Sequence, residues 1–233
     1  MFAVRPVGLV KTGFVWRPTI SADVTNWVLY SQAIAAGWDG VVPLDAEVTV
    51  GSGIVLSANS TSAYGFDTGS GFPAGTSLKL IMPGYVCGMG GAGGASAVAG
   101  SNGGPALRAQ HAITIDALGG VTAGGGGGGG GGNFGGLGGG GGGRTGSINS
   151  AGGSPSGVAG TFSSGGAGGS GGGAGGTTGP GGAGSVSSGG GGGGWGASGG
   201  TAGSYAGGTG GAAVVGNSYI TWINTGTRYG AIT

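Results

Sequence analysis

Glycine is concentrated in one long block of this chain, and the block limits what the chain can fold into. Of the 73 glycines in 233 residues, 11 lie in residues 1–87 and 2 lie in residues 217–233, so 60 lie in residues 88–216. Ordering a glycine costs about 0.5–1 kcal/mol more than ordering an alanine. The block is therefore either unfolded or held by a dense network of backbone hydrogen bonds that only glycine permits.

Uninterrupted glycine runs at 124–132, 138–143 and 189–194 favour packed rods. A polyproline II-type helix has no internal hydrogen bonds, rises about 3.1 Å per residue and directs its N–H and C=O groups outward. Because an all-glycine helix can be approached from every side, we predict a bundle of packed polyglycine II-type helices. The alternative is a flexible glycine linker. The alanine content and the scarcity of charge favour packing, since the block has three charged side chains: Arg108, Asp116 and Arg144.

Short apolar strands recur along the chain as an internal repeat. The pattern is apolar-x-apolar, then a glycine a few residues on, then another short strand, and it occurs at residues 78–80, 113–115 and 220–222. A shorter relative lies at 48–50. Period-two alternation indicates half-buried strands, and the glycine supplies the bend. We predict a short β-strand spine, solenoid-like or a small β-sheet, from which the glycine segments are excursions.

One short helix is expected in the N-terminal part. The segment WVLYSQAIAA predicts a helix that begins near Asn26, with Asp23 or Thr25 as its cap, and ends at Gly37. The fold class is therefore mostly β and irregular, with a solenoid-like strand spine, a polyglycine II-type bundle and one short N-terminal helix. The composition divides the chain into three regions: 1–87, 88–216 and a closing strand at 217–233.

Several classes of protein are excluded by composition. Collagen needs glycine at every third position and abundant proline, whereas GGNFGGLGGG breaks that register and prolines number only 8. A single cysteine excludes a disulfide framework. A net charge of +1 argues against nucleic-acid binding. The sequence contains no stretch of 18 apolar residues, so we expect no membrane insertion. The start of the chain does not have the pattern of a secretory signal.

Catalytic and metal-binding motifs are not recognised. His111 is the single histidine, and Cys87 sits in the apolar segment YVC, where a small buried side chain is expected. The carboxylates show no spacing typical of paired acid and base groups, and no Lys-Ser or Lys-Thr follows a glycine run to form a phosphate loop. We therefore expect no enzyme activity, no cofactor and no metal.

A few larger side chains stand alone within the glycine block. Isolated aromatic residues on small polar loops are typical of antibody-like binding surfaces. The alternative is packing against the side of the bundle or at a subunit interface. The two interpretations have equal weight for Phe134 and Phe162, and binding is favoured for Trp195 and Tyr205. The candidate binding residues are Asn133, Phe134, Leu137, Arg144, Phe162, Trp195 and Tyr205.

Three stretches carry a resemblance to a known group of proteins. They are residues 37–91, beginning GWDGVVPLDAEV, residues 103–132, containing HAITIDALGGVTAGGGG, and the end, VVGNSYITWINTGTRYGAIT. In these stretches the chain resembles glycine-rich bacteriophage proteins of the tail tip or distal tail fibre, over roughly residues 20–233. The resemblance implies a polyglycine II bundle whose variable loops touch a receptor on the host.

The resemblance thus predicts a receptor-binding protein of the virion, located at the tail tip or distal tail fibre and assembled in the host cytoplasm. Its expected partners are a host outer-membrane protein or surface glycan and other tail or fibre proteins. It is expected as a homotrimer, or as a monomer capping a trimeric fibre. Residues 1–87 would be the attachment module and 88–216 the receptor-binding domain. The candidate attachment residues are Phe14, Trp16 and Arg17.

Two alternatives remain at this level. A structural tail-tip protein or fibre connector would share the composition but make no receptor contact. A cellular glycine-rich wall or silk-like protein would have long uniform repeats and a secretion signal, and the sequence has neither.

Overall fold

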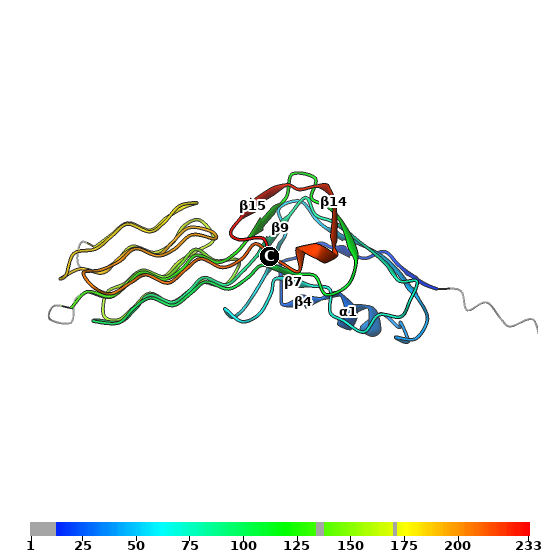
Figure 1. Ribbon diagram of the computed structural model, residues 1–233, viewed down its shortest axis with the longest axis horizontal. Coiled ribbons are helices and arrows are strands. Elements are labelled where there is room, and N and C mark those ends of the chain that lie inside the picture. Colours follow the sequence, from blue (N-terminus) through cyan, green and yellow to red (C-terminus); the bar gives the residue numbers. More distant parts are fainter. Residues whose placement is uncertain (1–12, 134–137, 170–171) are drawn as a thin grey trace, which may run out of the picture.

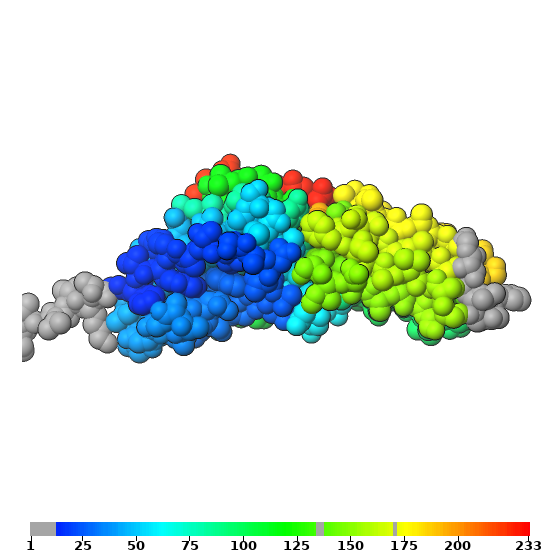
Figure 2. All heavy atoms as spheres, turned by 180° about the vertical axis from the view of Figure 1, so that it is seen from behind, coloured from blue at the N-terminus to red at the C-terminus, as the bar shows by residue number. Residues whose placement is uncertain are grey.

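The computed structural model describes residues 13–133, 138–169 and 172–233. Figure 1 shows two parts, a core of β-strands and an elongated bundle of extended glycine-rich segments that leaves one side of this core, and Figure 2 shows the same two parts from behind. The described residues contain one α-helix, α1 (Leu29–Ala35), and fifteen short strands. The prediction of a mostly β chain with one short N-terminal helix is confirmed.

The strands form three sheets in which every strand pairing is parallel. The first sheet contains β1 (Phe14–Trp16), β2 (Thr19–Ile20), β5 (Leu44–Val50), β8 (Ser77–Ile81), β11 (Ile113–Asp116) and β14 (Ile220–Asn224). The second contains β3 (Val24–Thr25), β6 (Val55–Ser57), β9 (Tyr85–Cys87), β12 (Val121–Ala123) and β15 (Thr227–Tyr229). The third contains β4 (Trp27–Val28), β7 (Phe66–Asp67), β10 (Leu107–Arg108) and β13 (Val214–Val215).

The chain visits the three sheets in the same order on each pass. After β1 and β2 it runs through β3 and β4, and the passes β5–β6–β7, β8–β9–β10 and β11–β12–β13 follow. A short 3-10 helix, Asn217–Tyr219, precedes β14 and β15. The repeated strands of the sequence therefore lie next to one another, with Leu80 paired to Val48 on one side and to Ile115 on the other. Ile115 in turn pairs with Trp222 of β14.

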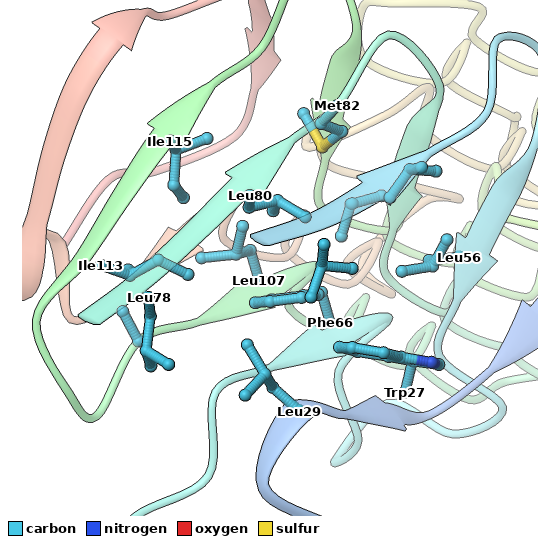
Figure 3. Packing of buried hydrophobic residues seen from close by; sticks show 14 of the residues in the cluster. Trp27, Leu29, Leu56, Phe66, Leu78, Leu80, Met82, Leu107, Ile113 and Ile115 are labelled. Atoms are coloured by element: carbon cyan, nitrogen blue, oxygen red, sulfur yellow. The ribbon is translucent and has the colours of Figure 1, made fainter. Parts of the chain in front are cut away.

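Buried and partly exposed residues alternate along the strands, and the buried ones form the core between the sheets. In β5 every second residue is buried, from Leu44 to Val50, and the intervening residues are partly exposed. Figure 3 shows side chains from several passes converging, with Leu80, Leu107 and Phe66 near the centre. Because each pass contributes apolar side chains at the same register, stacking the passes makes one continuous apolar interior.

The helix begins later than the sequence predicts. Residues 27–28 form β4, and α1 starts at Leu29 with no side-chain cap. Asn26 has a left-handed backbone, φ 52°, which a helix cannot continue through. Asp23 is not a cap either, because its Oδ1 accepts the backbone N–H of Val55 at 2.9 Å. The predicted end is confirmed, since Gly37 follows the helix with φ 100°.

Both glycine excursions leave the core at the same corner. Residues 88–106 connect β9 to β10 and residues 124–213 connect β12 to β13, so each excursion starts after the second sheet and returns to the third. Strands β10 to β13 lie between these compositional boundaries but belong to the core. The division at residues 87 and 216 therefore follows composition, and the region between them contains strands of all three sheets.

Residues 125–132 lie inside the bundle, and their amides bond to three neighbouring segments in rotation, whereas Gly124 donates to the carbonyl of Tyr229 in the core. Every third N–H donates to the same neighbour. The first neighbour is the segment 98–104, whose Gly104, Ser101 and Val98 carbonyls accept from Gly125, Gly128 and Gly131, in that order. The second is the segment 138–144, whose Arg144, Gly141 and Gly138 carbonyls accept from Gly126, Gly129 and Gly132. The third is the segment 197–200, whose Ala197 and Gly200 carbonyls accept from Gly127 and Gly130. These bonds are 2.5–2.9 Å long. Backbone groups, rather than side chains, fill the interior of the bundle.

Candidate functional site

Several chain reversals lie together at the end of the bundle that points away from the core. We call residues 95–98, 133, 154–156, 185–188 and 201–205 the far turns (Figure 1, left end). Backbone hydrogen bonds join them: Ala97 donates to Gly132, Asn133 donates to Val186, and Ser96 donates to Ser154. Gly184 and Ala202 form a further parallel bridge. Turns that are distant in the sequence therefore make one continuous surface.

The far turns contain two of the predicted binding residues. Asn133 is exposed and Tyr205 is half-buried. Two valines, Val98 and Val186, are 51% and 57% exposed there, an apolar contribution that the sequence interpretation missed because valine is not an unusual residue in a loop. Two further predicted residues, Phe134 and Leu137, lie outside the described residues.

The remaining predicted binding residues gather at the opposite end, where the bundle meets the core. We call Tyr85, Arg144, Phe162, Trp195 and Tyr229 the root cluster. Their ring centroids lie 5.3 Å apart for Tyr85 and Phe162, 5.3 Å for Phe162 and Trp195, and 5.9 Å for Trp195 and Tyr229. Trp195 is only 5% exposed, and its indole N–H donates to the carbonyl of Thr145 at 3.2 Å.

Arg144 holds the root cluster together from the side. Its guanidinium carbon lies 3.4 Å from the centroid of the Trp195 ring, a cation–π contact. Its Nε donates to the carbonyl of Phe162 at 2.8 Å and its Nη1 donates to that of Thr177 at 2.6 Å. Burial lowers the pKa of this guanidinium from its ordinary value. Arg144 thus ties the chain at Phe162 and at Thr177 to one aromatic ring.

The expectation that Trp195 binds a receptor therefore has to be corrected. An aromatic side chain finds an apolar environment at the root of the bundle because β9 and β15 supply Tyr85 and Tyr229 there. The sequence analysis assigned Trp195 to a loop because its glycine neighbours have no side chains against which the indole could pack. Phe162 and Arg144 belong to the same packed group, so these three side chains support the bundle.

Of the predicted attachment residues, Phe14 and Trp16 lie on β1 and Arg17 follows it. Phe14 and Trp16 pack on the core, with Trp16 stacked on Trp27 at 6.2 Å between ring centroids. Arg17 forms an exposed ion pair with Asp45 at 2.6 Å. Among the described residues, β1 pairs with β5 alone, so its other edge is an edge of the first sheet as far as the structure describes it.

The described residues contain no group of three His, Cys, Asp or Glu side chains that could hold a metal ion. His111 is half-buried and lies against Phe72, with 4.9 Å between ring centroids. Within the described part of the chain, no helix is long and apolar enough to cross a bilayer.

Cys87 is fully buried beside the root cluster, and its thiol is expected to make the unfolding free energy depend on pH. Burial raises the pKa of this thiol from 9.0 to about 12, partly opposed by Arg144. The folded state thus keeps the proton, and the resulting stability is complete below pH 9 and is lost as the pH rises from 9 towards 12. We expect the unfolding free energy of the parent, relative to Cys87→Ala, to fall by up to about 1.4 kcal/mol per pH unit there. A difference that stays flat in denaturant titrations from pH 8 to 11 would contradict this.

Comparison with known proteins agrees with this architecture. The family model described as phage tail fibre adhesin Gp38 matches residues 16–233. A solved structure, the gp37-gp38 adhesin tip complex of the bacteriophage S16 long tail fibre, contains a chain that is 25% identical, with a TM-score of 0.69 over 95% of this chain and 82% of the other. No curated protein matches the chain. Since the family model spans both the core and the bundle, the chain belongs to the Gp38 family of phage tail fibre adhesins.

Proposed function

We propose that this adhesin adsorbs the phage to its host through the far turns, with the glycine bundle as a rigid support. The observation that carries the proposal is that separate turns meet at the end of the bundle away from the core, where Asn133, Val98 and Val186 are exposed. The ligand is an outer-membrane protein or surface glycan of the host. A rigid support reduces the ordering cost of binding.

The bundle is proposed to consist of polyglycine II-type helices. Donation by every third amide of 125–132 to the same neighbour supports a threefold helix, which has three residues per turn. The strand core is proposed as a three-sided solenoid of stacked passes. The fixed order in which the chain visits the three sheets supports this arrangement.

The opposite side of the protein is proposed to attach to another tail fibre protein. The related structure is an adhesin tip complex of two fibre proteins, which supports a partner of this kind. The open edge of β1, with Val15 65% exposed between Phe14 and Trp16, is the proposed attachment surface. The assembly is either a homotrimer or a monomer that caps a trimeric fibre, at the tail tip of the virion. The proposed role is adhesive and not catalytic.

Substitutions in the far turns test the adsorption proposal. We expect Asn133→Ala combined with Tyr205→Ala to weaken saturable binding to host cells by about tenfold or more, because aromatic and amide side chains supply most of the energy at such surfaces. The melting temperature should change by less than about 2 °C, since the backbone bonds of the turn remain.

The matched control is Ile223→Ala, which removes a 57% exposed apolar side chain from β14 of the core and should leave binding unchanged. Replacing the far turns 154–156, 185–188 and 201–205 with those of a phage of different host range, while the root cluster is kept, should transfer that range. A folded double variant that binds as the parent does would contradict the proposal. A folded parent that binds no host cell would favour the structural fibre connector instead.

A further inference from the structure

A surface recess of about 230 Å³ lies on the third sheet, close to the root of the bundle. The loop 58–64, between β6 and β7, forms one wall with Ser62 and Tyr64. Strands β4, β7 and β10 form the floor. The recess is smaller than the roughly 300–1,000 Å³ of most small-molecule pockets, so its occupant is the size of a single sugar ring. It is separate from the far turns, which lie at the other end of the bundle.

The recess contains one ion pair whose geometry is fixed. Arg108 donates to Oδ2 of Asp67 through Nε at 3.0 Å and through Nη2 at 2.5 Å. Its guanidinium also lies over the Tyr64 ring, 4.4 Å from the centroid. Nη1 takes no part in the bonds to the carboxylate. Because the two charges compensate each other and no other charged side chain lines the recess, it suits a neutral ligand.

Hydrogen bonds within the protein fix both the floor of the recess and the loop that forms its wall. Oδ1 of Asp67 accepts the N–H of Gly69 at 2.9 Å and the Nε2 amide of Gln110 at 3.1 Å. Oδ1 of Asn26 accepts the N–H of Asn59 at 3.0 Å, which ties the loop to the sheet. Asn26 itself has a left-handed backbone, which asparagine adopts more readily than most residues. A site that is already ordered loses little entropy on binding.

The remaining groups offer both polar and apolar contacts. The hydroxyl groups of Ser62 and Tyr64 and the amide of Asn26 can donate and accept hydrogen bonds. Val28 and Ala63 add an apolar surface. A pyranose ring has the same two aspects, a rim of hydroxyl groups and apolar C–H faces. A second recess, near Thr76, Thr114 and Thr221, lacks both a charged and an aromatic side chain.

From this arrangement we infer that the recess binds one neutral monosaccharide unit of a host surface glycan. This second contact rests on the proposed adsorption function for its biological purpose, and it lies beside the root of the bundle rather than at its end. A single weak sugar contact becomes useful when several fibres of one phage engage the surface together.

The test uses the full chain and ligand-observed saturation-transfer NMR. The probes are methyl β-galactopyranoside and methyl α-glucopyranoside, with galacturonate and inorganic phosphate as anionic probes. We expect at least one neutral glycoside to bind with a dissociation constant of about 1–10 mM, and the anions to bind more weakly. Ala63→Trp, which fills the recess, should abolish the signal. Ser62→Ala combined with Tyr64→Phe should weaken binding by about tenfold through the loss of two hydroxyl groups.

Thr221→Ala, in the second recess, is the matched control and should bind as the parent does. The hydroxyl variants keep the test valid if Ala63→Trp does not fold. Absence of any glycoside signal with the folded parent would overturn the inference, as would unchanged binding in the folded variants or binding of the anionic probes alone. Failure here is distinguishable from failure of the adsorption proposal, because a parent that binds cells but no glycoside refutes only the recess.

Discussion

Gly128→Ala is expected to destabilise the protein by about 3 kcal/mol or more, which is the cost of overpacking where no atom can move away. A Cβ at Gly128 would overlap the carbonyl of Ala92 in the neighbouring segment. Both atoms belong to backbones that are fixed by hydrogen bonds, so no rotamer change relieves the contact. Thermal unfolding should show a decrease in melting temperature of about 6–12 °C.

Gly179→Ala provides the matched control for this prediction. Among the described residues no atom lies within 4 Å of a Cβ added there, and the backbone of Gly179 has no positive φ. This substitution should be neutral or slightly stabilising, because alanine restricts the unfolded chain. Equal melting temperatures for the two variants would show that the interior of the bundle is not packed as described.

Trp195→Ala is expected to cost about 3–5 kcal/mol, the range for removing a buried aromatic side chain. The loss is expected at the root cluster, where Arg144 would also lose its cation–π contact. The melting temperature should fall by about 6–20 °C. Limited proteolysis should then cut the chain around Thr177, at the root of the bundle, before it cuts the strand core.

The control for Trp195→Ala is Tyr219→Ala, which removes an aromatic side chain that is 50% exposed. Its effect should stay within about 0.5 kcal/mol, as for most surface substitutions. If Trp195→Ala kept the melting temperature of the parent and lost only cell binding, the original interpretation of Trp195 as a receptor contact would be restored.

The strand core was predictable because its signals are local. Apolar residues at every second position of 78–80, 113–115 and 220–222 indicate strands. Because the three segments have the same pattern, they were expected to lie side by side, as they do in the first sheet. Parallel stacking brings equivalent positions into register without any long-range information. The helix start was misplaced because the left-handed backbone of Asn26 depends on its bond to Asn59, which no local pattern indicates.

The candidate site was only partly predictable. Asn133 and Tyr205 were selected because they interrupt glycine runs, and they lie at the far turns, whereas the same reasoning selected Trp195, which is buried. Whether an isolated aromatic residue lies at a far turn or at the root depends on how many residues separate it from each reversal. That count could not be made from the sequence, because the reversals within a run of glycine, alanine and serine have no distinctive residues.

The shared exit corner of the two glycine excursions restricts how proteins of this architecture can change in length. Each excursion starts and ends beside the core, so a segment that travels outward must be followed by one that returns. Insertions that preserve the core will therefore add or remove paired segments. Where the length of a segment changes, multiples of three keep each amide opposite its former neighbour. Duplication or loss of whole glycine hairpins offers such a lineage new contact surfaces while the strands beneath keep their register.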